Sequence, residues 1–419
     1  MSESPADDGA SGEIDVLVIG AGAAGLFAAT AAAERGRRTV LLEKNRRPGV
    51  KILASGGTRC NVTSTLPIAA LGRLFGRRAE RFLRFGLHEM SPLRVRELLA
   101  AEDVPTTDHP LEKVFPASGK AGDVLDAFLR RAQKAGVEIR THAGVLSIER
   151  RAAGGFVVRT TLGDVEARSV VVAAGGKSYP KTGCTGDAYA WLEGLGHTIT
   201  PTRPALVPLV VDLPWVRALT GIAVEDATVR AVAENGKVAF ERRRPVLFTH
   251  RGLSGPGPMD ASRYLNDRPA ARLEIDWLPR ATPEQIEARL EPSRRGAALA
   301  SFAVANELPK RLISGLMLHA GIPEERTLAQ LKREERRALV AAVKRCRIPI
   351  KGDEGFDKAE VTAGGAELDE FDPVTMQSRR VSGLYVAGEV LDIDGPIGGF
   401  NFQAAFSTGF AAGLGVSRR

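Results

Sequence analysis

Residues 15–25, Asp-Val-Leu-Val-Ile-Gly-Ala-Gly-Ala-Ala-Gly, decide the fold. Four apolar residues run directly into a glycine-rich turn, and the alanine-rich residues 26–34 that follow are expected to be helical. In a G-x-G-x-x-G turn between a strand and a helix, the first glycine permits the tight turn. The second lets a pyrophosphate approach the backbone, and the third lets the helix pack on the strand. We therefore predict a nucleotide site at Gly20, Gly22 and Gly25, where the positive end of the helix dipole favours phosphate.

A second predicted strand, residues 39–42, strengthens this interpretation because it ends at Glu43. A carboxylate at this place accepts hydrogen bonds from the hydroxyls of a nucleotide ribose. The alternative is an ordinary exposed glutamate at the end of a strand. The glycine turn and Glu43 together favour the nucleotide site over that alternative.

The length and the charge of the chain limit the classes of function. With 419 residues, two or three domains are expected, and 44% hydrophobic with 26% charged residues is a globular composition. The net charge is +8, with basic residues dense in 73–96, 242–244 and 332–347. We interpret these as solvated helix faces and a loop. Their alternative is binding of an anionic substrate or nucleic acid, but no RNA- or DNA-binding motif accompanies them, so nucleic acid is not expected.

Cysteine content and the N-terminus indicate a reducing, cytoplasmic location. The three cysteines, Cys60, Cys184 and Cys346, are widely spaced and form no C-x-x-C motif, which argues against a disulfide framework or a zinc site. Residues 1–12 are acidic and lack a signal-peptide pattern, so we expect a disordered tail. No apolar run is long enough to span a membrane. Asp392 and Asp394 suit turns better than a metal site, and no metal is expected.

The stretch 44–63 follows the predicted ribose-binding strand and shows neither helical nor strand periodicity. It contains Lys51-Ile52-Leu53-Ala54-Ser55-Gly56-Gly57-Thr58-Arg59-Cys60-Asn61. Small residues and adjacent glycines let a loop lie with its backbone close to a flat cofactor. A plain surface loop is the alternative, although Ile52, Leu53 and Val62 would be unusual there.

The middle of the chain changes character at about residue 203. Before it, we expect helices in 66–101 and 118–135, an extended loop at 106–116, and strands in 137–148, 155–161 and 165–172. The last strand runs into Ala174 and Gly175, where backbone could contact the cofactor. After residue 203, short strands are predicted at 206–213, 227–233, 238–242 and 272–277, with a hairpin turn at Asn235-Gly236 and a rigid loop at 248–258. Residues 282–347 are expected to be helical, with capping boxes beginning at Thr282 and Thr327.

Glycine-rich sequence returns near the C-terminus. Residues 361–366 precede a predicted strand in 383–389, and a glycine pair, Gly398-Gly399, opens an apolar helix that extends to about residue 414. A strand that ends in Ala-Gly-Glu beside such a helix entry provides a second edge for binding an anion and a ring.

These motifs, taken together and in this order, resemble the bacterial flavoprotein family that includes BaiN-type and aminoacetone-oxidase-like proteins. The motifs are the GAGAAG turn, Glu43-Lys44, KILASGGTRCN, the AAGG strand end and YVAGEVLDIDGPIGGFNFQAA. The resemblance implies an α/β fold: a Rossmann-like, glutathione-reductase-like FAD-binding domain with an inserted antiparallel β-barrel and a helical subdomain. The implied segments are a tail (1–12), the FAD domain (13–202 and 355–419), the barrel (203–279) and the helical subdomain (280–354).

The same resemblance implies roles for individual residues at the FAD. The implied FAD contacts are Gly20, Gly22, Ala23, Ala24 and Gly25 at the pyrophosphate; Glu43 and Lys44 at the ribose; Val145 at the adenine; Lys51, Ser55, Gly56, Gly57 and Asn61 beside the flavin; Ala174 and Gly175 at its border; and Gly388, Glu389, Gly399, Phe400, Asn401 and Phe402 at the closing edge. The sequence departs from the family pattern at Val50, Thr58 and Cys184, which stand where arginine, glycine and serine are more usual.

For catalysis we consider Lys51, Arg59 and Cys60. The two cations would stabilise a reduced anionic flavin or an anionic substrate, with surface charge as the alternative; Cys60 is either catalytic or structural. The leading hypothesis is an FAD-dependent oxidoreductase of a small organic substrate, with NADH, NADPH or oxygen as redox partner. Since there is a single dinucleotide fingerprint, any nicotinamide would bind transiently. The alternative is a flavin-binding or nucleic-acid-associated protein without turnover. The substrate and the oligomeric state do not follow from the sequence.

Overall fold

The computed structural model describes residues 13–265, 272–291 and 307–417. The acidic tail expected at 1–12 lies outside these residues. The chain forms two compact units, one made of Met1–Thr202 with Thr362–Arg419 and the other of Arg203–Val361. The division falls within strands β10 (Ile199–Ala205) and β20 (Val361–Ala366).

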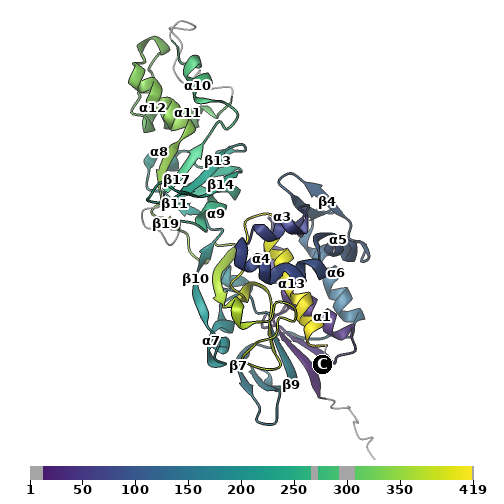
Figure 1. Ribbon diagram of the computed structural model, residues 1–419. Coiled ribbons are helices and arrows are strands. Elements are labelled where there is room, and N and C mark those ends of the chain that lie inside the picture. The colour runs from purple at the N-terminus through teal and green to yellow at the C-terminus, as the bar shows by residue number, and fades with distance from the viewer. Residues whose placement is uncertain (1–12, 266–271, 292–306, 418–419) are drawn as a thin grey trace, which may run out of the picture. The chain divides into compact units, whose positions relative to one another are not determined.

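A twisted sheet in the order β6-β2-β1-β9-β8-β7, with β21 paired to β9, forms the centre of the first unit (Figure 1). Its parallel strands are β1 (Ile14–Ile19), β2 (Thr39–Leu42), β6 (Glu138–Arg140), β9 (Gly163–Val172) and β21 (Leu384–Val386). Its antiparallel edge is β8 (Phe156–Thr160) with β7 (Val145–Arg150). This arrangement, together with the helices that cover it, confirms the expected Rossmann-like α/β fold.

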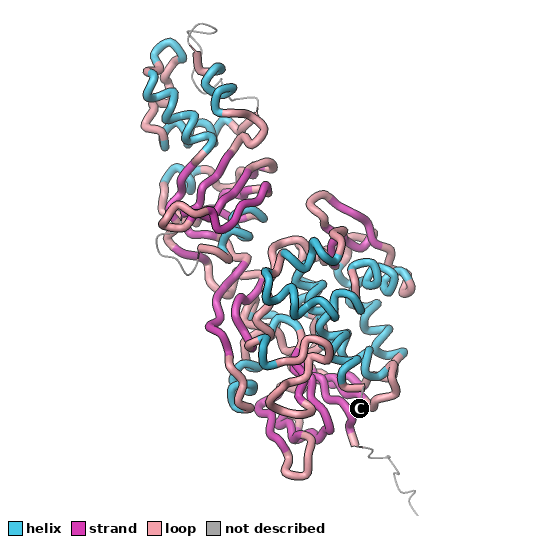
Figure 2. The backbone as a smooth tube through the Cα atoms, in the orientation of Figure 1, coloured by secondary structure: helices cyan, strands magenta, loops and turns pink. Residues whose placement is uncertain are grey.

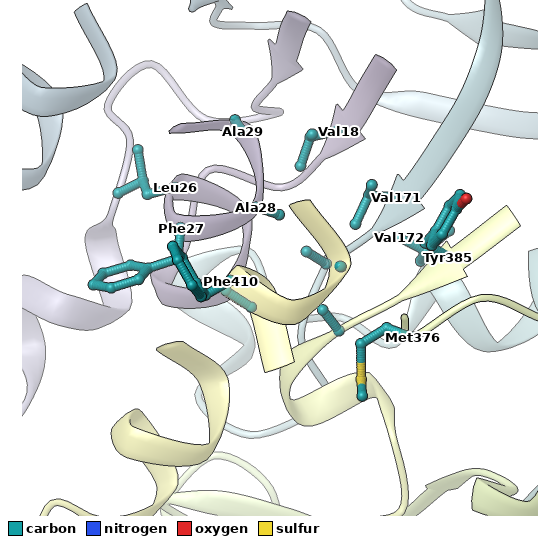
Figure 3. Packing of buried hydrophobic residues seen from close by; sticks show 14 of the residues in the cluster. Val18, Leu26, Phe27, Ala28, Ala29, Val171, Val172, Met376, Tyr385 and Phe410 are labelled. Atoms are coloured by element: carbon teal, nitrogen blue, oxygen red, sulfur yellow. The ribbon is translucent and has the colours of Figure 1, made fainter. Parts of the chain in front are cut away.

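Helices α1 (Ala23–Ala33) and α13 (Phe400–Gly415) pack together beside this sheet (Figure 3). A Cβ on Gly409 of α13 would lie 2.2 Å from the carbonyl oxygen of Ala24, so only glycine permits this approach. Phe27 of α1 stacks on Phe406 of α13 with ring centroids 4.5 Å apart. This contact joins an N-terminal helix to a C-terminal one, and so brings the two glycine-rich ends of the chain into one core.

Besides α1 and α13, the first unit contains further helices and a small three-stranded sheet, β3-β5-β4; Figure 2 colours its helices and strands. The helices are α2 (Val50–Ala54), α3 (Ile68–Arg73), α4 (Gly76–Glu89), α5 (Pro92–Ala100), α6 (Ala121–Lys134) and α7 (Asp187–Gly194). The stretch expected to be a loop without periodicity contains α2, because a single turn is too short to show an apolar repeat. The extended loop expected at 106–116 is instead a hairpin of β4 (Thr106–His109) and β5 (Lys113–Pro116), which also pairs with β3 (Thr63–Ser64). Its turn places Leu111 and Glu112 at φ of 65° and 59°, so no glycine marked it.

The second unit contains two antiparallel sheets where a barrel was expected. One sheet is β12 (Ala223–Val224), β15 (Val246–Thr249), β16 (Gly252–Ser254), β11 (Leu209–Val210) and β19 (Gly352–Asp353). The other is β14 (Val238–Arg243), β13 (Thr228–Val232), β17 (Arg272–Asp276) and β18 (Cys346–Pro349). The hairpin expected at Asn235-Gly236 joins β13 to β14. Phe248 and Trp277 stack in the core of this unit, with centroids 5.5 Å apart.

The prediction of a rigid loop at 248–258 is wrong. These residues form the end of β15, all of β16 and the start of α9 (Pro256–Ser262). Pro256 stands in the first turn of α9, where the missing N–H is not needed by the helix. Pro256 and Pro258 therefore belong to a helix and not to a loop.

The segment expected to be helical, 282–347, contains α10 (Pro283–Arg289), α11 (Lys310–His319) and α12 (Arg333–Lys344). Its residues 292–306 lie outside the described part. A further helix of the unit, α8 (Pro214–Ala218), comes earlier in the sequence. The capping box of Thr282 begins α10, as expected, whereas that of Thr327 begins only a 3₁₀ turn, Leu328–Gln330. In the described parts of both units, no helix is long and apolar enough to cross a bilayer.

Candidate functional site

The carboxyl ends of four parallel strands meet at one edge of the main sheet. Ile19 of β1 pairs with Leu42 of β2 and with Val172 of β9, and Val172 pairs with Val386 of β21. The segments that directly follow these strands hold four groups of predicted site residues. Ligands of open α/β sheets bind outside the carboxyl ends of the strands, so this register brings together pieces from both ends of the chain.

The three glycines of the first turn differ in what surrounds them. Gly20 has a φ of 100°, and a Cβ on it would lie 2.7 Å from the carbonyl oxygen of Ala173. A Cβ on Gly25 would lie 1.8 Å from the oxygen of Gly20. A Cβ on Gly22 would meet no atom of the described residues within 4 Å. The protein itself therefore requires Gly20 and Gly25, whereas the open space at Gly22 fits the close approach of a ligand phosphate.

Glu43 is buried directly after β2 and faces the glycine turn. Its Oε2 accepts a hydrogen bond from the N–H of Ala21 at 3.0 Å, and its Oε1 accepts one from the N–H of Asn45 at 2.9 Å. Ala143 donates its N–H to the Glu43 carbonyl at 2.9 Å, which holds the segment leading to Val145 beside this strand end. The adjacent Lys44 donates from Nζ to Asp187 Oδ2 at 2.7 Å, so its charge is paired within the protein.

The segment 55–61 is a strained loop that Asn61 anchors at its C-terminal end. Gly56, Gly57, Thr58 and Cys60 all have positive φ, of 56°, 65°, 68° and 58°. Such conformations are uncommon outside glycine and are retained at functional sites when the surrounding structure enforces them. Asn61 anchors the loop by accepting the N–H of Val114 at Oδ1, 3.1 Å away, and a Cβ on Gly57 would meet no protein atom within 4 Å.

Two of the three catalytic candidates, Arg59 and Cys60, lie in this loop and differ in accessibility. Arg59 is exposed, and its guanidinium lies 4.7 Å from the ring centroid of Phe115. Cys60 is fully buried, and burial raises the pKa of its thiol to about 12, although a hydrogen bond with Ser55 opposes the shift. A thiol with such a pKa is protonated at neutral pH and is a poor nucleophile. This environment favours the structural alternative for Cys60.

Lys51 belongs to a polar cluster that unites three strand ends. Its Nζ donates to Glu389 Oε2 at 2.6 Å and to Ser178 Oγ at 2.7 Å. Ser178 in turn donates to Glu389 Oε1 at 2.5 Å, and the N–H of Thr362 donates to the same oxygen at 2.9 Å. Lys51 and Glu389 were expected at the site, whereas Ser178 and Thr362 were not. The only sequence signal for these two was their position in glycine-rich stretches near predicted strand ends.

Cys184 and Tyr189 lie beside this polar cluster. Burial raises the pKa of the Cys184 thiol, and the charge of Lys51 opposes that shift. A Cβ on Gly175 would lie 3.0 Å from Cys184 Sγ. The Tyr189 hydroxyl is buried without a hydrogen-bond partner among the described residues; burial and then the nearby Glu389 raise its pKa. A buried polar atom without a protein partner is what a site for an additional group would leave.

The C-terminal edge is positioned mainly by backbone contacts. Gly388 approaches the glycine turn, since a Cβ on it would lie 2.8 Å from Ala24 Cβ. Gly399 has a φ of 80° directly before α13. Asn401 Oδ1 accepts the Gly395 N–H at 2.7 Å, which fixes the preceding loop. Phe400 is fully buried in the core, so only its backbone is available to a ligand, while Phe402 is partly buried.

A family model for the HI0933-like protein Rossmann domain matches residues 14–415. The chain belongs to this family. The family comprises FAD-dependent oxidoreductases, which agrees with the resemblance carried by the sequence motifs. The protein is therefore an FAD-dependent flavoenzyme, and the alternative of a flavin-binding protein without turnover is not carried further.

Three relatives of this flavoenzyme cover nearly its whole length. It is 34% identical over 404 residues to the ribosomal RNA dihydrouridine synthase of Escherichia coli, covering 95% of this chain and 96% of the relative. It is 32% identical over 410 residues to a protein of the same name from Haemophilus influenzae, covering 96% and 98%. It is 31% identical over 411 residues to the 3-dehydro-bile acid delta(4,6)-reductase of Clostridium scindens, again covering 96% and 98%.

No cluster of three or more histidine, cysteine or acidic side chains suited to a metal ion is present in the described ranges. Asp392 and Asp394 thus have no further ligand there to complete such a site.

Proposed function

We propose that this flavoenzyme reduces a carbon–carbon double bond conjugated to a carbonyl group, and that its substrate is a uridine in RNA. The observation that carries the proposal is the 34% identity, over 95% of the chain, to a protein named ribosomal RNA dihydrouridine synthase. Dihydrouridine forms when the ring double bond of uracil, conjugated to a carbonyl, takes up a hydride and a proton. The relative named as a reductase of a 3-dehydro-bile acid indicates the same reaction class on a small molecule. The RNA substrate departs from our expectation of a small organic molecule.

We infer that FAD lies along the edge where the four parallel strands end. When bound there, FAD supplies hydride transfer at its isoalloxazine ring. The N-terminus of α1, with the open space at Gly22, receives the pyrophosphate, and Glu43 accepts hydrogen bonds from the ribose. Residues 51–61, Ala174, Gly175 and the segment before α13 form the part of the site that faces the ring.

Lys51 places a cation, ion-paired with Glu389, on this side of the site. Its side chain is 23% exposed, and Glu389 and Ser178 hold its ammonium in one position. A fixed cation next to a site where negative charge develops is a preorganised electrostatic stabiliser. We therefore assign Lys51 the role of stabilising negative charge on the reduced ring or on the substrate carbonyl. Arg59 is exposed and remains available to an anionic substrate.

The electron donor in this proposal is NADH or NADPH. The sequence contains one dinucleotide fingerprint, which FAD occupies in our assignment. The nicotinamide therefore binds transiently and leaves before the substrate is reduced. Oxygen competes with the substrate for the electrons of the reduced flavin. Oxygen consumption in the presence of substrate measures that competition.

The test is a comparison of two substrates with the purified holoenzyme. RNA from a strain that lacks this gene, incubated with enzyme and NADPH or NADH, is digested to nucleosides, and dihydrouridine is quantified by mass spectrometry. A 3-oxo-4-ene steroid is supplied in parallel reactions. We expect dihydrouridine to form with RNA, and the Lys51→Met variant to form it at least tenfold more slowly while retaining bound flavin. Reduction of the steroid but not of RNA would contradict the RNA assignment. Reduction of neither, with the flavin readily reduced by NAD(P)H, would contradict the reaction class.

A further inference from the structure

Three exposed arginines of α4, Arg77, Arg81 and Arg84, form a row along one face of the helix. Since successive residues of an α-helix are about 100° apart, the three lie within roughly 60° of one another around the axis. The buried residues of the helix, among them Phe82 and Gly86, lie on the opposite face. We call these three residues the α4 arginine row.

The α4 arginine row has no partner within the described part of the chain. No ion pair, hydrogen bond or ring contact involves its guanidinium groups there. Arg78, the next residue to Arg77, behaves differently, because it pairs with Glu367 and with Asp369. Carboxylates therefore pair with the arginine beside the row, whereas the three arginines of the row form no ion pair with a described residue.

The row is fixed to the same unit as the FAD site. A Cβ on Gly86 would lie 2.8 Å from the carbonyl oxygen of Ser407, so α4 packs directly on α13. Gln403 of α13 donates from Nε2 to the carbonyl of Met90, directly after α4, at 2.6 Å. Gly395, in the loop before α13, lies against the ring of Phe75 at the start of α4. The helix that carries the row is thus held at both ends to the segment that closes the proposed flavin site.

We propose that the α4 arginine row binds the phosphate backbone of the RNA whose uridine is reduced, an inference that rests on the proposed function. A guanidinium donates paired hydrogen bonds to phosphate and stays charged at every physiological pH. The row advances by about 6 Å and then about 4.5 Å along the helix axis, so it follows an extended chain of phosphates and does not converge on one small anion. A basic row of this kind supplies affinity and orientation without reading sequence.

A membrane surface fits this row less well than RNA. Helices that lie in a bilayer interface place large apolar side chains in the lipid beside their basic face. The large hydrophobic side chains that are exposed in the described residues are elsewhere, as at Leu93 of α5 and Leu146 of β7. The apolar face of α4 is already covered by α13. Anionic vesicles therefore serve as the competing probe in the test.

The test compares two pairs of arginines with the same spacing. The variant R77Q/R81Q removes two charges from the row. The matched variant R333Q/R337Q removes two exposed arginines, also four residues apart, from α12, and neither has an ion-pair partner among the described residues. The probe is a fluorescein-labelled 20-nucleotide single-stranded RNA, and fluorescence anisotropy measures its binding to the holoenzymes from 0.05 to 0.4 M NaCl. Flavin absorption and the melting temperature establish that each variant is folded.

We expect R77Q/R81Q to lower the slope of log K against log salt by about 1.4, from about 0.7 for each lost phosphate contact on a single strand. That decrease in slope corresponds to about 25-fold weaker binding at 0.1 M salt. The R333Q/R337Q variant should retain the wild-type slope and bind within about twofold of wild type. An unchanged slope for R77Q/R81Q, or binding of phosphatidylglycerol vesicles in preference to RNA, would overturn the proposal.

Measurements of enzymatic turnover distinguish a failure of the docking role from a failure of the proposed function. If the wild type reduces RNA and R77Q/R81Q raises KM for RNA while leaving the rate of flavin reduction by NAD(P)H unchanged, the docking role is supported. If RNA is reduced with the same KM by both, the docking role is refuted while the proposed function stands. If the row binds RNA as expected but no dihydrouridine forms, the docking role stands and the proposed function fails.

Discussion

Substitution of Gly22 by alanine should separate cofactor binding from folding. Gly22 has φ −85° and ψ −166°, which an alanine adopts without strain, and in the described part of the chain its added Cβ would meet no atom within 4 Å. We therefore expect the free energy of unfolding of the protein without flavin to change by no more than about 0.5 kcal/mol. The new methyl group instead occupies the space assigned to the pyrophosphate. Loss of one backbone hydrogen bond to a charged phosphate costs about 1.5–3 kcal/mol, which weakens FAD binding about ten- to 150-fold.

The matched control is Gly25→Ala, in the same turn. Its Cβ would lie 1.8 Å from the carbonyl oxygen of Gly20, so the helix must move away from the strand end. We expect this variant to lose about 1–3 kcal/mol of stability even without FAD, by overpacking. Thermal unfolding of the flavin-free proteins measures their stability. Quenching of FAD fluorescence on titration measures their affinity for FAD. If Gly22→Ala bound FAD as tightly as the wild type, or if it were destabilised as much as Gly25→Ala, the reasoning would be refuted.

Three further predictions follow from other contacts. Glu43→Ala should weaken FAD binding about tenfold, through loss of the ribose hydrogen bonds, and unchanged affinity in a fluorescence titration would contradict the ribose assignment. Cys60 should resist iodoacetamide in the native protein up to pH 9, because burial raises its pKa to about 12, and should react only on unfolding; rapid native labelling, detected by mass spectrometry, would disprove its burial. Glu102 is hydrogen-bonded by Lys134 and Arg130, which hold its pKa below its ordinary value of 4.5. Its charge therefore stabilises the fold above that pH, so Glu102→Gln should lower the melting temperature at pH 7, and the difference from wild type should shrink as the pH falls below 4.5.

The part of the site that could be predicted is the part whose backbone conformation depends on consecutive residues. The first turn needs glycine at Gly20 and Gly25 for steric reasons, and the four buried residues directly before it are apolar, so both leave a recognisable sequence pattern. The strand end at Glu43 is local in the same sense. These features were enough to predict an α/β nucleotide-binding fold without any knowledge of distant contacts.

The part that was not predictable depends on contacts between residues far apart in the sequence. Ser178 joins Lys51 and Glu389 because β9 and β21 are neighbours in the sheet. Thr362 comes from β20, a strand of another sheet, and no local pattern predicts that these segments meet. The sequence left Cys60 open between a catalytic and a structural role, and its burial, which favours the structural one, is set by surrounding elements. Burial and charge pairing are properties of the assembled chain.

The basic segment around α4 shows the same division. The sequence by itself determined that residues 73–96 are rich in arginine, and we interpreted them as a solvated face. Only the tertiary structure decided that Arg78 has acidic partners while Arg77, Arg81 and Arg84 have none in the described residues. The physical reason is that a helix fixes which side chains share a face, but its packing partner decides which of them meet a carboxylate. The glycine turn at 20–25 required no such information, because its own backbone sets the conformation that it needs.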